Sequence, residues 1–161
     1  MRLYVVRHVK AGDRKKWKHA PDADRPISSN GRRQAEALAK RLVGEDIGAL
    51  YASPILRCMQ SLEPLARLTG VPIAADERLV EGSSFAESLE LVREVPDRTV
   101  LCSHGDVIPD LLSALARRGM ELTNQPDWRK ATLWILDGPG ERTPDGDPVF
   151  TTATVEPPPK V

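Results

Sequence analysis

The segment Leu3-Tyr4-Val5-Val6-Arg7-His8 determines how the rest of this sequence is interpreted. It opens with apolar and aromatic residues, among them two β-branched valines, a composition typical of a strand that is buried on both faces of a sheet. The run then ends in two polar residues, Arg7 and His8. Because ligands of open α/β sheets bind beyond the carboxyl ends of the strands, we expect both side chains to face a functional crevice.

Short apolar runs alternate with amphipathic helical segments along the rest of the chain. This alternation predicts right-handed βαβ crossovers and therefore an α/β fold, with three α/β/α layers and a mostly parallel central sheet. The last two strands are expected to form a hairpin. Further strands are predicted at residues 49–52, 71–74, 99–102, 132–136 and 149–155, and helices are predicted to begin near residues 35, 53, 87 and 106.

Local signals predict where some of these elements begin and end. The polar segment 12–29 is expected to be a long loop that Asn30-Gly31 closes, and Ser53-Pro54 is expected to supply the N-cap and the first residue of the next helix. The prolines at 157–159 cannot continue a sheet. We therefore expect a single domain over residues 1–156 and a flexible Pro-rich tail over residues 157–161.

Composition narrows the class of partner and the compartment. The 161 residues include 23 Lys plus Arg and 23 Asp plus Glu, so the chain as a whole has no basic footprint for a nucleic acid polymer. The two cysteines, Cys58 and Cys102, are far apart and form no CxxC pair or disulfide framework. The sequence contains no signal-peptide pattern and no apolar run of about 18 residues, so no membrane contact is expected. These features predict a cytoplasmic protein and leave its oligomeric state unknown.

Two further residues should converge with His8 at the carboxyl edge of the sheet. His104 directly follows a predicted strand, and Arg57 lies in the first turns of a helix that follows another. Each residue alone is more often structural or solvated, because short motifs have a high false-positive rate. Together with Arg7 they make two fixed cations and two imidazoles, a combination suited to a tetrahedral dianion such as a phosphate group.

These residues lie in three motifs that resemble those of the histidine phosphatase superfamily, which contains phosphoglycerate mutases and acid phosphatases. The motifs are LYVVRH at 3–8, SPILRCMQS at 53–61 and VLCSHG at 100–105. The resemblance covers most of the chain and implies a phosphoglycerate mutase-like fold. Residues 7–11 and 22–35 are similar to the short branch that includes bacterial phosphohistidine phosphatases. The chain also resembles a phosphatase-like domain fused to some mycobacterial Nudix hydrolases. Val9 replaces the glycine that many members have after the nucleophile, which argues against the mutase branch.

The resemblance implies a role for each residue of the site. His8 is the nucleophile, while Arg7, Arg57 and His104 bind the phosphoryl oxygens. The other ring nitrogen of His8 must be hydrogen-bonded to fix the tautomer, and the sequence does not identify its partner; a nearby backbone carbonyl is one candidate. Glu81 lies between the second and third motifs, where the family commonly places its acid. It is expected to protonate the leaving group, and the alternative is an exposed loop glutamate. Positive side chains take the place of a metal ion, so neither a metal nor another cofactor is expected.

The substrate is expected to be a phosphorylated small molecule, including a nucleotide, or a phosphoprotein that carries phosphohistidine. The alternative is a non-catalytic phosphate-binding module of the same fold, although binding alone would not require His8. A receiver domain is disfavoured because the first strand does not end in acidic residues. Lys10 is either a further phosphate contact or a surface charge. The basic run at 14–18 either contacts an acidic protein surface or a nucleotide, with Trp17 available for stacking, or is a solvated loop, which is the favoured interpretation.

Overall fold

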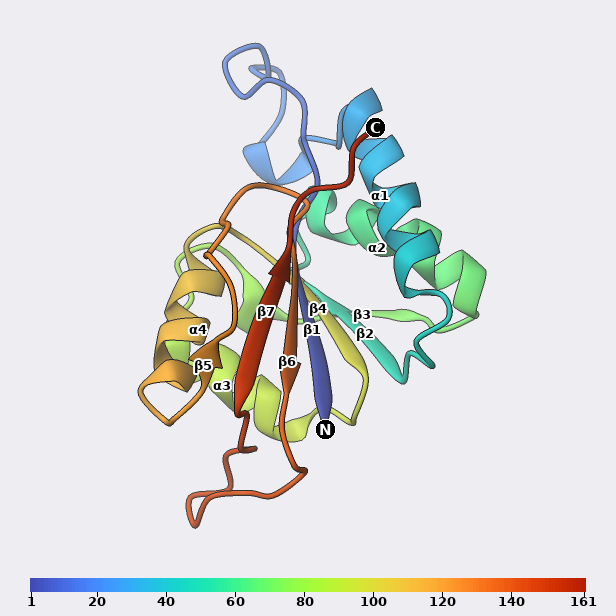
Figure 1. The fold of residues 1–161 in the computed structure, drawn as a ribbon. Coiled ribbons are helices and arrows are strands. Elements are labelled where there is room, and N and C mark those ends of the chain that lie inside the picture. Colours follow the sequence, from blue (N-terminus) through green and yellow to red (C-terminus); the bar gives the residue numbers. More distant parts are fainter.

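A seven-stranded sheet lies at the centre of the computed structural model, which describes all 161 residues (Figure 1). Its strands are β1 (Arg2–Arg7), β2 (Ala49–Ala52), β3 (Ile73–Ala75), β4 (Thr99–Ser103), β5 (Glu121–Leu122), β6 (Leu133–Asp137) and β7 (Thr152–Glu156). The helices are α1 (Ser29–Leu42), α2 (Leu56–Thr69), α3 (Phe85–Glu94) and α4 (Val107–Ala116), with short 3₁₀ helices at Asp22–Asp24 and Glu77–Leu79. Helices α1 and α2 cover one face of the sheet and α3 and α4 cover the other, which confirms the three-layer α/β fold.

The strand order is β3-β2-β4-β1-β6-β7-β5, and only β6 runs against the other strands. The sheet is thus mostly parallel, as the alternation of elements predicted. Strand β4 pairs with both β1 and β2: the last residues of β1 and β4 lie opposite each other, and Ala52 of β2 lies opposite Cys102. Because these three strands end at one level, the residues that follow them, including His8 and His104, meet at one edge of the sheet.

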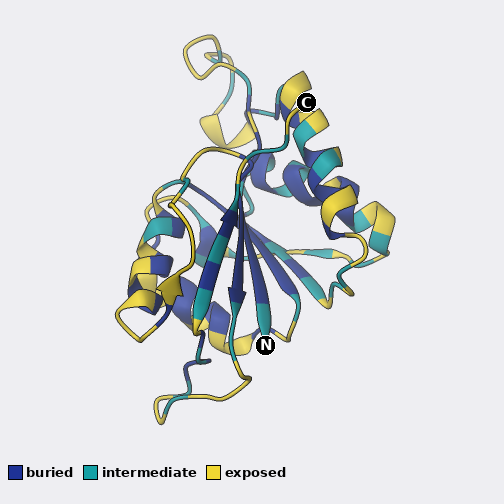
Figure 2. Cartoon of the chain, in the orientation of Figure 1, coloured by how far each residue is buried: buried dark blue, intermediate teal, exposed yellow.

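Side chains of the central strands alternate between two hydrophobic cores, one on each face of the sheet. Figure 2 shows that these strands are mostly buried. Leu3 and Val5 of β1 pack with α3 and α4, whereas Tyr4 and Val6 pack with α1 and α2. Each core contains 18 buried residues, so both helical layers are held by extensive apolar burial. Burial on both faces explains why β1 has the uninterrupted apolar sequence of an interior strand.

Helix α1 begins before Asn30-Gly31, so the prediction that this pair closes the preceding loop was wrong. Ser28 is the N-cap, and its Oγ accepts a hydrogen bond from the N–H of Gly31 at 3.1 Å. The glycine is required by packing rather than by a turn, because a Cβ at this position would lie 1.9 Å from the carbonyl oxygen of Lys10. Helix α1 therefore lies directly against the residues that follow β1.

The start of α2 also differs from the prediction. Ser53 and Pro54 precede the helix, which begins at Leu56 with Ile55 in the N-cap position and no side-chain cap. The buried face of the first turn carries Arg57, whose side chain is almost fully enclosed. A buried arginine needs polar partners, and those partners lie at the carboxyl edge of the sheet.

The predicted terminal hairpin is confirmed, because β6 and β7 pair in antiparallel register. Strand β5 was not predicted; it is only two residues long and pairs with β7. The residues after β7 run beside the N-terminal end of α1 (Figure 1). The division into one domain and a flexible tail stays a prediction. None of the helices combines the length and the apolar character that a membrane span requires.

Candidate active site

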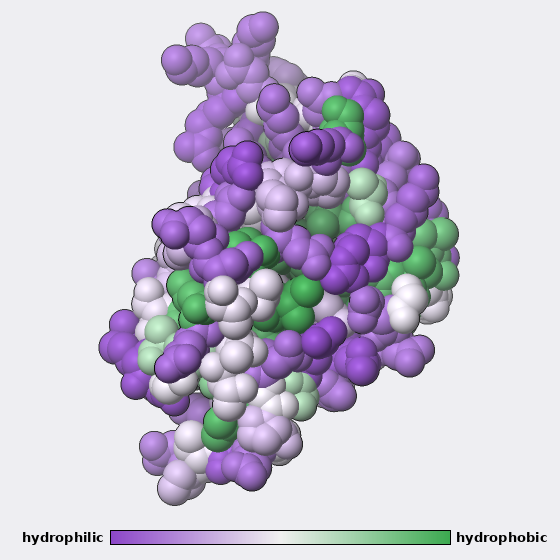
Figure 3. Space-filling model, in the orientation of Figure 1, coloured by the Kyte–Doolittle hydropathy of each residue, from purple (hydrophilic) through white to green (hydrophobic).

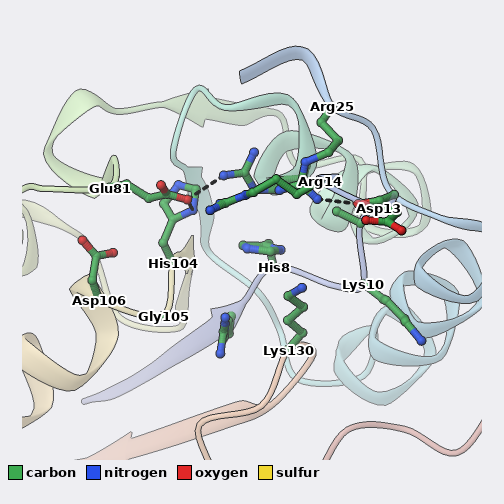
Figure 4. Close-up of a pocket in the computed structure, with 14 residues that line it drawn as sticks. His8, Lys10, Asp13, Arg14, Arg25, Glu81, His104, Gly105, Asp106 and Lys130 are labelled. Atoms are coloured by element: carbon green, nitrogen blue, oxygen red, sulfur yellow. Dashed lines mark hydrogen bonds and ion pairs between the residues drawn. The ribbon is translucent and has the colours of Figure 1, made fainter. Parts of the chain in front are cut away.

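A cavity of about 930 Å³ opens at the carboxyl edge of the parallel strands (Figure 4). Fourteen residues line it and only one of them is hydrophobic, so the cavity suits a polar ligand. All five residues predicted for the site are among the lining residues. The lining cations are Arg7, Lys10, Arg14, Arg25, Arg57 and Lys130, and the lining acids are Asp13, Glu81 and Asp106. The cavity is therefore strongly electropositive.

His8 lies at the inner wall of the cavity and is only 4% exposed. Its Nδ1 is 2.9 Å from the carbonyl oxygen of Val9. Because a carbonyl only accepts, the proton belongs on Nδ1, and Nε2 keeps a free lone pair. Burial lowers the pKa of His8 to about 3, and the nearby charges of His104, Arg57 and Arg7 lower it as well, against the opposite effect of the Val9 bond. The imidazole is therefore neutral near pH 7.

His104 faces His8 edge-on across the cavity wall. The two ring centroids are 5.4 Å apart, with an angle of 63° between the ring planes. The Nε2 of His104 lies 2.9 Å from the Oγ of Ser53 and 3.5 Å from the Sγ of Cys58, both of which are buried. The Nδ1 lies 3.1 Å from a carboxylate oxygen of Glu81 but is not aligned with it for a hydrogen bond. The Nε2 of His104 is thus held by buried groups, whereas its Nδ1 faces the cavity.

Arg57 is fixed between two acidic residues. Its Nη2 lies 2.5 Å from Glu81 Oε1 and 3.3 Å from Asp22 Oδ2, and its Nη1 donates to the backbone carbonyl of Asp22 at 3.1 Å. The Nε is buried and has no partner. The contacts of Nη1 and Nη2 fix the orientation of the Arg57 guanidinium, and its unpartnered Nε is left to donate to a further anionic ligand.

Arg7 makes no ion pair, although its side chain is largely enclosed. Its Nη1 donates to the carbonyl oxygen of Trp128 at 2.6 Å, and its buried Nε has no partner. Burial lowers the pKa of Arg7, but a guanidinium group stays charged in proteins. Gly105 makes room for this guanidinium, since a Cβ at that position would lie 2.7 Å from Arg7 Cζ.

Glu81 is the most exposed of the five predicted residues, with 47% of its side chain accessible. It lies in the segment between the 3₁₀ helix Glu77–Leu79 and α3, directly before Gly82. The N–H of Gly82 donates to Asp106 Oδ2 at 2.8 Å, which ties this segment to the start of α4. In Figure 4 the Glu81 carboxylate lies next to the His104 ring, at the rim of the cavity.

The sequence analysis missed several residues that line the cavity or support its side chains. Lys130 lies between β5 and β6, distant in the chain from every motif, yet its amine points toward His8 (Figure 4). Arg25 comes from the polar loop and donates to the carbonyl oxygen of Gly12 at 2.6 Å. Ser53 was interpreted as a helix cap rather than as a partner of His104. Residues of this kind are recognised only once the fold brings them together.

The polar loop at 12–28 projects from the same end of the molecule, which hydrophilic side chains cover in Figure 3. The sequence left open the roles of Lys10 and of the basic run at 14–18. Lys10 and Arg14, the first residue of that run, both line the cavity. The Trp17 ring instead contacts the His19 ring in a tilted arrangement, with the ring centroids 4.1 Å apart and an angle of 58° between the ring planes, and its Nε1 donates to the carbonyl oxygen of Pro21 at 3.0 Å. The loop thus contributes charge to the cavity while its aromatic residue packs within the loop.

A family model and individual related proteins match the sequence of this chain. Residues 3–87 match the sequence model of the Histidine phosphatase superfamily (branch 1). The 8-oxo-(d)GTP phosphatase of Mycolicibacterium smegmatis is 34% identical over 141 residues, which is 83% of this chain and 43% of that protein. This chain therefore spans less than half the length of that relative. An uncharacterized protein of Picosynechococcus sp. is 32% identical over 72% of this chain and 73% of its own.

The fold is shared with solved phosphatase structures. The structure of the protein histidine phosphatase SixA complexed with tungstate has a TM-score of 0.70 and 20% identity, covering 95% of this chain and 96% of that chain. At this identity the likeness concerns the fold alone. The evidence for family membership is the segment 3–87, which matches the family model and covers more than half of this chain. The chain therefore belongs to the histidine phosphatase superfamily.

Proposed function

We propose that this protein is a phosphatase that moves a phosphoryl group from its substrate to Nε2 of His8 and then to water. The observation that carries the proposal is the condition of His8. Its ring is buried and neutral, its Nδ1 is engaged by the Val9 carbonyl, and it lines a cavity with six cations. A neutral imidazole with a free lone pair, set among cations, is a competent nucleophile toward a phosphate group.

The phosphoryl oxygens would be held by Arg7, Arg57 and His104. In the structure one carboxylate oxygen of Glu81 lies between Arg57 Nη2 and His104 Nδ1, at 2.5 and 3.1 Å, which supports a position for a phosphoryl oxygen between the same two groups. The Ser53 hydroxyl and the Cys58 thiol can both donate to His104 Nε2, which favours a proton on Nδ1, directed at the cavity. Each preorganised donor of this kind lowers the barrier by about 2.7–4 kcal/mol.

In the first step Nε2 of His8 bonds to phosphorus while the bond from phosphorus to the leaving oxygen breaks. Glu81, in its acid form, gives its proton to that oxygen, so the leaving group departs in its protonated form. In the second step a water molecule attacks the phosphohistidine, Glu81 takes its proton, and the phosphorus–nitrogen bond breaks. Inorganic phosphate leaves and His8 returns to its neutral form. The accessible position of Glu81 at the cavity rim supports this role, because it can reach both a leaving group and water.

Two substrate classes remain within this proposal, a small phosphoester such as a nucleotide and a protein phosphohistidine. The Mycolicibacterium smegmatis relative has a name that refers to a nucleotide substrate, and the SixA structure that shares the fold is described as a protein histidine phosphatase. A panel of nucleotides, sugar phosphates and a phosphohistidine protein, compared by kcat/KM, will rank the two classes.

The proposal is tested by hydrolysis of p-nitrophenyl phosphate in excess EDTA, with and without vanadate. We expect activity that survives EDTA, that vanadate inhibits and that His8→Ala abolishes. His19→Ala is the matched control, because His19 is exposed and lies outside the cavity. Thermal melting of both variants verifies that they fold.

Trapping the intermediate gives an independent measurement. Rapid quenching during turnover should yield a phosphoenzyme that is labile in acid and stable in base, as a phosphoramidate is, and that is absent from His8→Ala. Hydrolysis retained by a folded His8→Ala protein would refute the nucleophile. Phosphate binding without any hydrolysis by the wild-type protein would instead indicate the non-catalytic binding module.

A further inference from the structure

A second hollow of about 490 Å³ adjoins the catalytic cavity. We call it the outer hollow; its lining residues are Arg7, Lys10, Gln34, Arg129, Lys130 and Pro158. Three of these residues, Arg7, Lys10 and Lys130, also line the cavity that contains His8, so the two spaces share a wall. In Figure 4 the Lys130 amine points toward His8, whereas the Lys10 amine points away from it.

The outer hollow is lined by four cations and no acidic residue. Of the four, only Arg129 is paired, through Asp127 at 2.6 Å. Arg7, Lys10 and Lys130 take part in no ion pair, in contrast to the other cations of the catalytic cavity, which share the Asp22 carboxylate. The uncompensated positive charge is thus concentrated on the wall between the two spaces.

Two further observations indicate that this charge is available to a ligand. Burial lowers the pKa of Lys130, and the positive charges of the surrounding arginines, Arg7 first among them, lower it further, so an anion bound beside Lys130 would relieve this repulsion. The amide oxygen of Gln34 accepts a hydrogen bond from the backbone N–H of Lys10 at 3.0 Å. Its amide nitrogen, a donor of two hydrogens, is then left for another partner.

We propose that the outer hollow is a subsite for a second phosphate group, joined to the phosphate that reacts at His8, so that the site takes a small molecule with a diphosphate or longer phosphate chain. The inference rests on the proposed function, because it takes His8 as the position of the terminal phosphate. Adjacent phosphates of one chain must lie side by side, and the shared wall of Arg7 and Lys130 can contact both. A monoester would leave the outer cations unpaired.

The test compares two ligands that cannot be hydrolysed and that differ in one phosphonate group, methylphosphonate and methylenediphosphonate. Both are measured as competitive inhibitors of p-nitrophenyl phosphate hydrolysis in EDTA, at matched ionic strength because salt screens exposed charges. We expect the inhibition constant of the diphosphonate to be lower by about 10-fold or more, as charge-assisted hydrogen bonds to a second anion imply.

The variant Lys10→Gln removes one outer cation, and Lys40→Gln, on the exposed side of α1, is the matched control. We expect Lys10→Gln to reduce the ratio between the two inhibition constants by about 3- to 10-fold and the control to leave it unchanged. Equal inhibition by the two ligands in the wild-type protein, or an unchanged ratio in Lys10→Gln, would overturn the subsite.

Competition by hexaglutamate tests whether the outer hollow instead binds the carboxylates of an acidic protein segment. If it competes as strongly as methylenediphosphonate, the outer hollow accepts an acidic protein segment and the assignment to a phosphate chain is wrong. A protein that hydrolyses no phosphate ester contradicts the proposed function instead. In that case titration calorimetry with the same two phosphonates still measures whether the outer hollow binds a second anion.

Discussion

Replacing Gly105 by alanine should remove most of the activity while leaving the protein folded. A Cβ at this position would lie 2.7 Å from Cζ, 2.8 Å from Nη2 and 3.0 Å from Nη1 of Arg7. Favourable carbon contacts need about 3.5–4.0 Å, so one side must move. The Gly105 backbone has no left-handed φ, and the contacted atoms are the far end of a flexible side chain, so the guanidinium of Arg7 yields rather than the backbone.

The two consequences differ in size. Displacing Arg7 loses its hydrogen bond to Trp128, a charged bond of the kind that contributes about 1.5–3 kcal/mol. The lower backbone entropy of alanine in the unfolded chain returns about 0.4–1 kcal/mol, so the free energy of unfolding should fall by about 0.5–2.6 kcal/mol. Losing a preorganised donor to the transition state is larger, about 10²–10³ in kcat.

The assay is a double-mutant cycle on p-nitrophenyl phosphate with Gly105→Ala, Arg7→Gln and the double variant. If Gly105 acts only through Arg7, the double variant should be no slower than Arg7→Gln alone. Gly44→Ala is the matched control, because no atom lies within 4 Å of the Cβ it would introduce. A Gly105→Ala protein within about threefold of wild type, or a full further loss in the Arg7→Gln background, would refute this reasoning.

The remaining predictions concern four other positions. The pKa of His8 is about 3 in the folded protein and 6.5 in the unfolded chain, so between these values the unfolded chain binds a proton that the native protein does not. The free energy of unfolding should therefore fall by up to about 1.4 kcal/mol for each unit by which the pH is lowered in this range. His8→Gln should lose this pH dependence in urea unfolding, and parallel pH profiles of the two proteins would contradict the prediction. Ser53→Ala should lower kcat/KM and reduce the free energy of unfolding by about 1–3 kcal/mol, because it weakens the inner support of His104; an unchanged kcat/KM would show that the contact is only structural. Gly31→Ala should lower the urea midpoint by an amount equivalent to about 1–3 kcal/mol or more, since its Cβ would meet a backbone carbonyl at 1.9 Å; an unchanged midpoint would count against the clash. Glu81→Gln should lower kcat yet strengthen inhibition by orthophosphate, because the carboxylate and phosphate compete for the same arginine; weaker inhibition would argue against a shared position.

The parts of the site that could be predicted from sequence are those that follow from topology. His8 and His104 each come directly after an apolar strand, and parallel strands that end at one level bring such residues together. Arg57 follows from the same reasoning, because it lies in the first turn of α2, the helix that follows β2. No side-chain geometry was needed to place these three residues at one edge.

Other features depend on tertiary contacts that local patterns do not contain. Ser53 has the residue type of an N-cap, but its hydroxyl lies against His104 and the helix starts later. Asn30-Gly31 has the composition of a turn, but the need for a close approach to Lys10 explains the glycine within α1. Lys130 lies in an irregular segment with no periodicity, so only the folded structure shows that it lines the cavity.

The cations of this site both attract phosphate and help to keep the nucleophile uncharged, but these two effects respond differently to a bound substrate. A phosphate dianion cancels part of the positive charge of Arg7 and Arg57, and on that account alone it would favour a protonated imidazole. Burial, the largest cause of the low pKa of His8, does not depend on those charges, and a ligand that fills the cavity only increases it. The Val9 carbonyl acts in the opposite direction, yet it is what leaves the lone pair on Nε2. The enclosed position of His8 after β1 is therefore what keeps it able to attack while phosphate is bound.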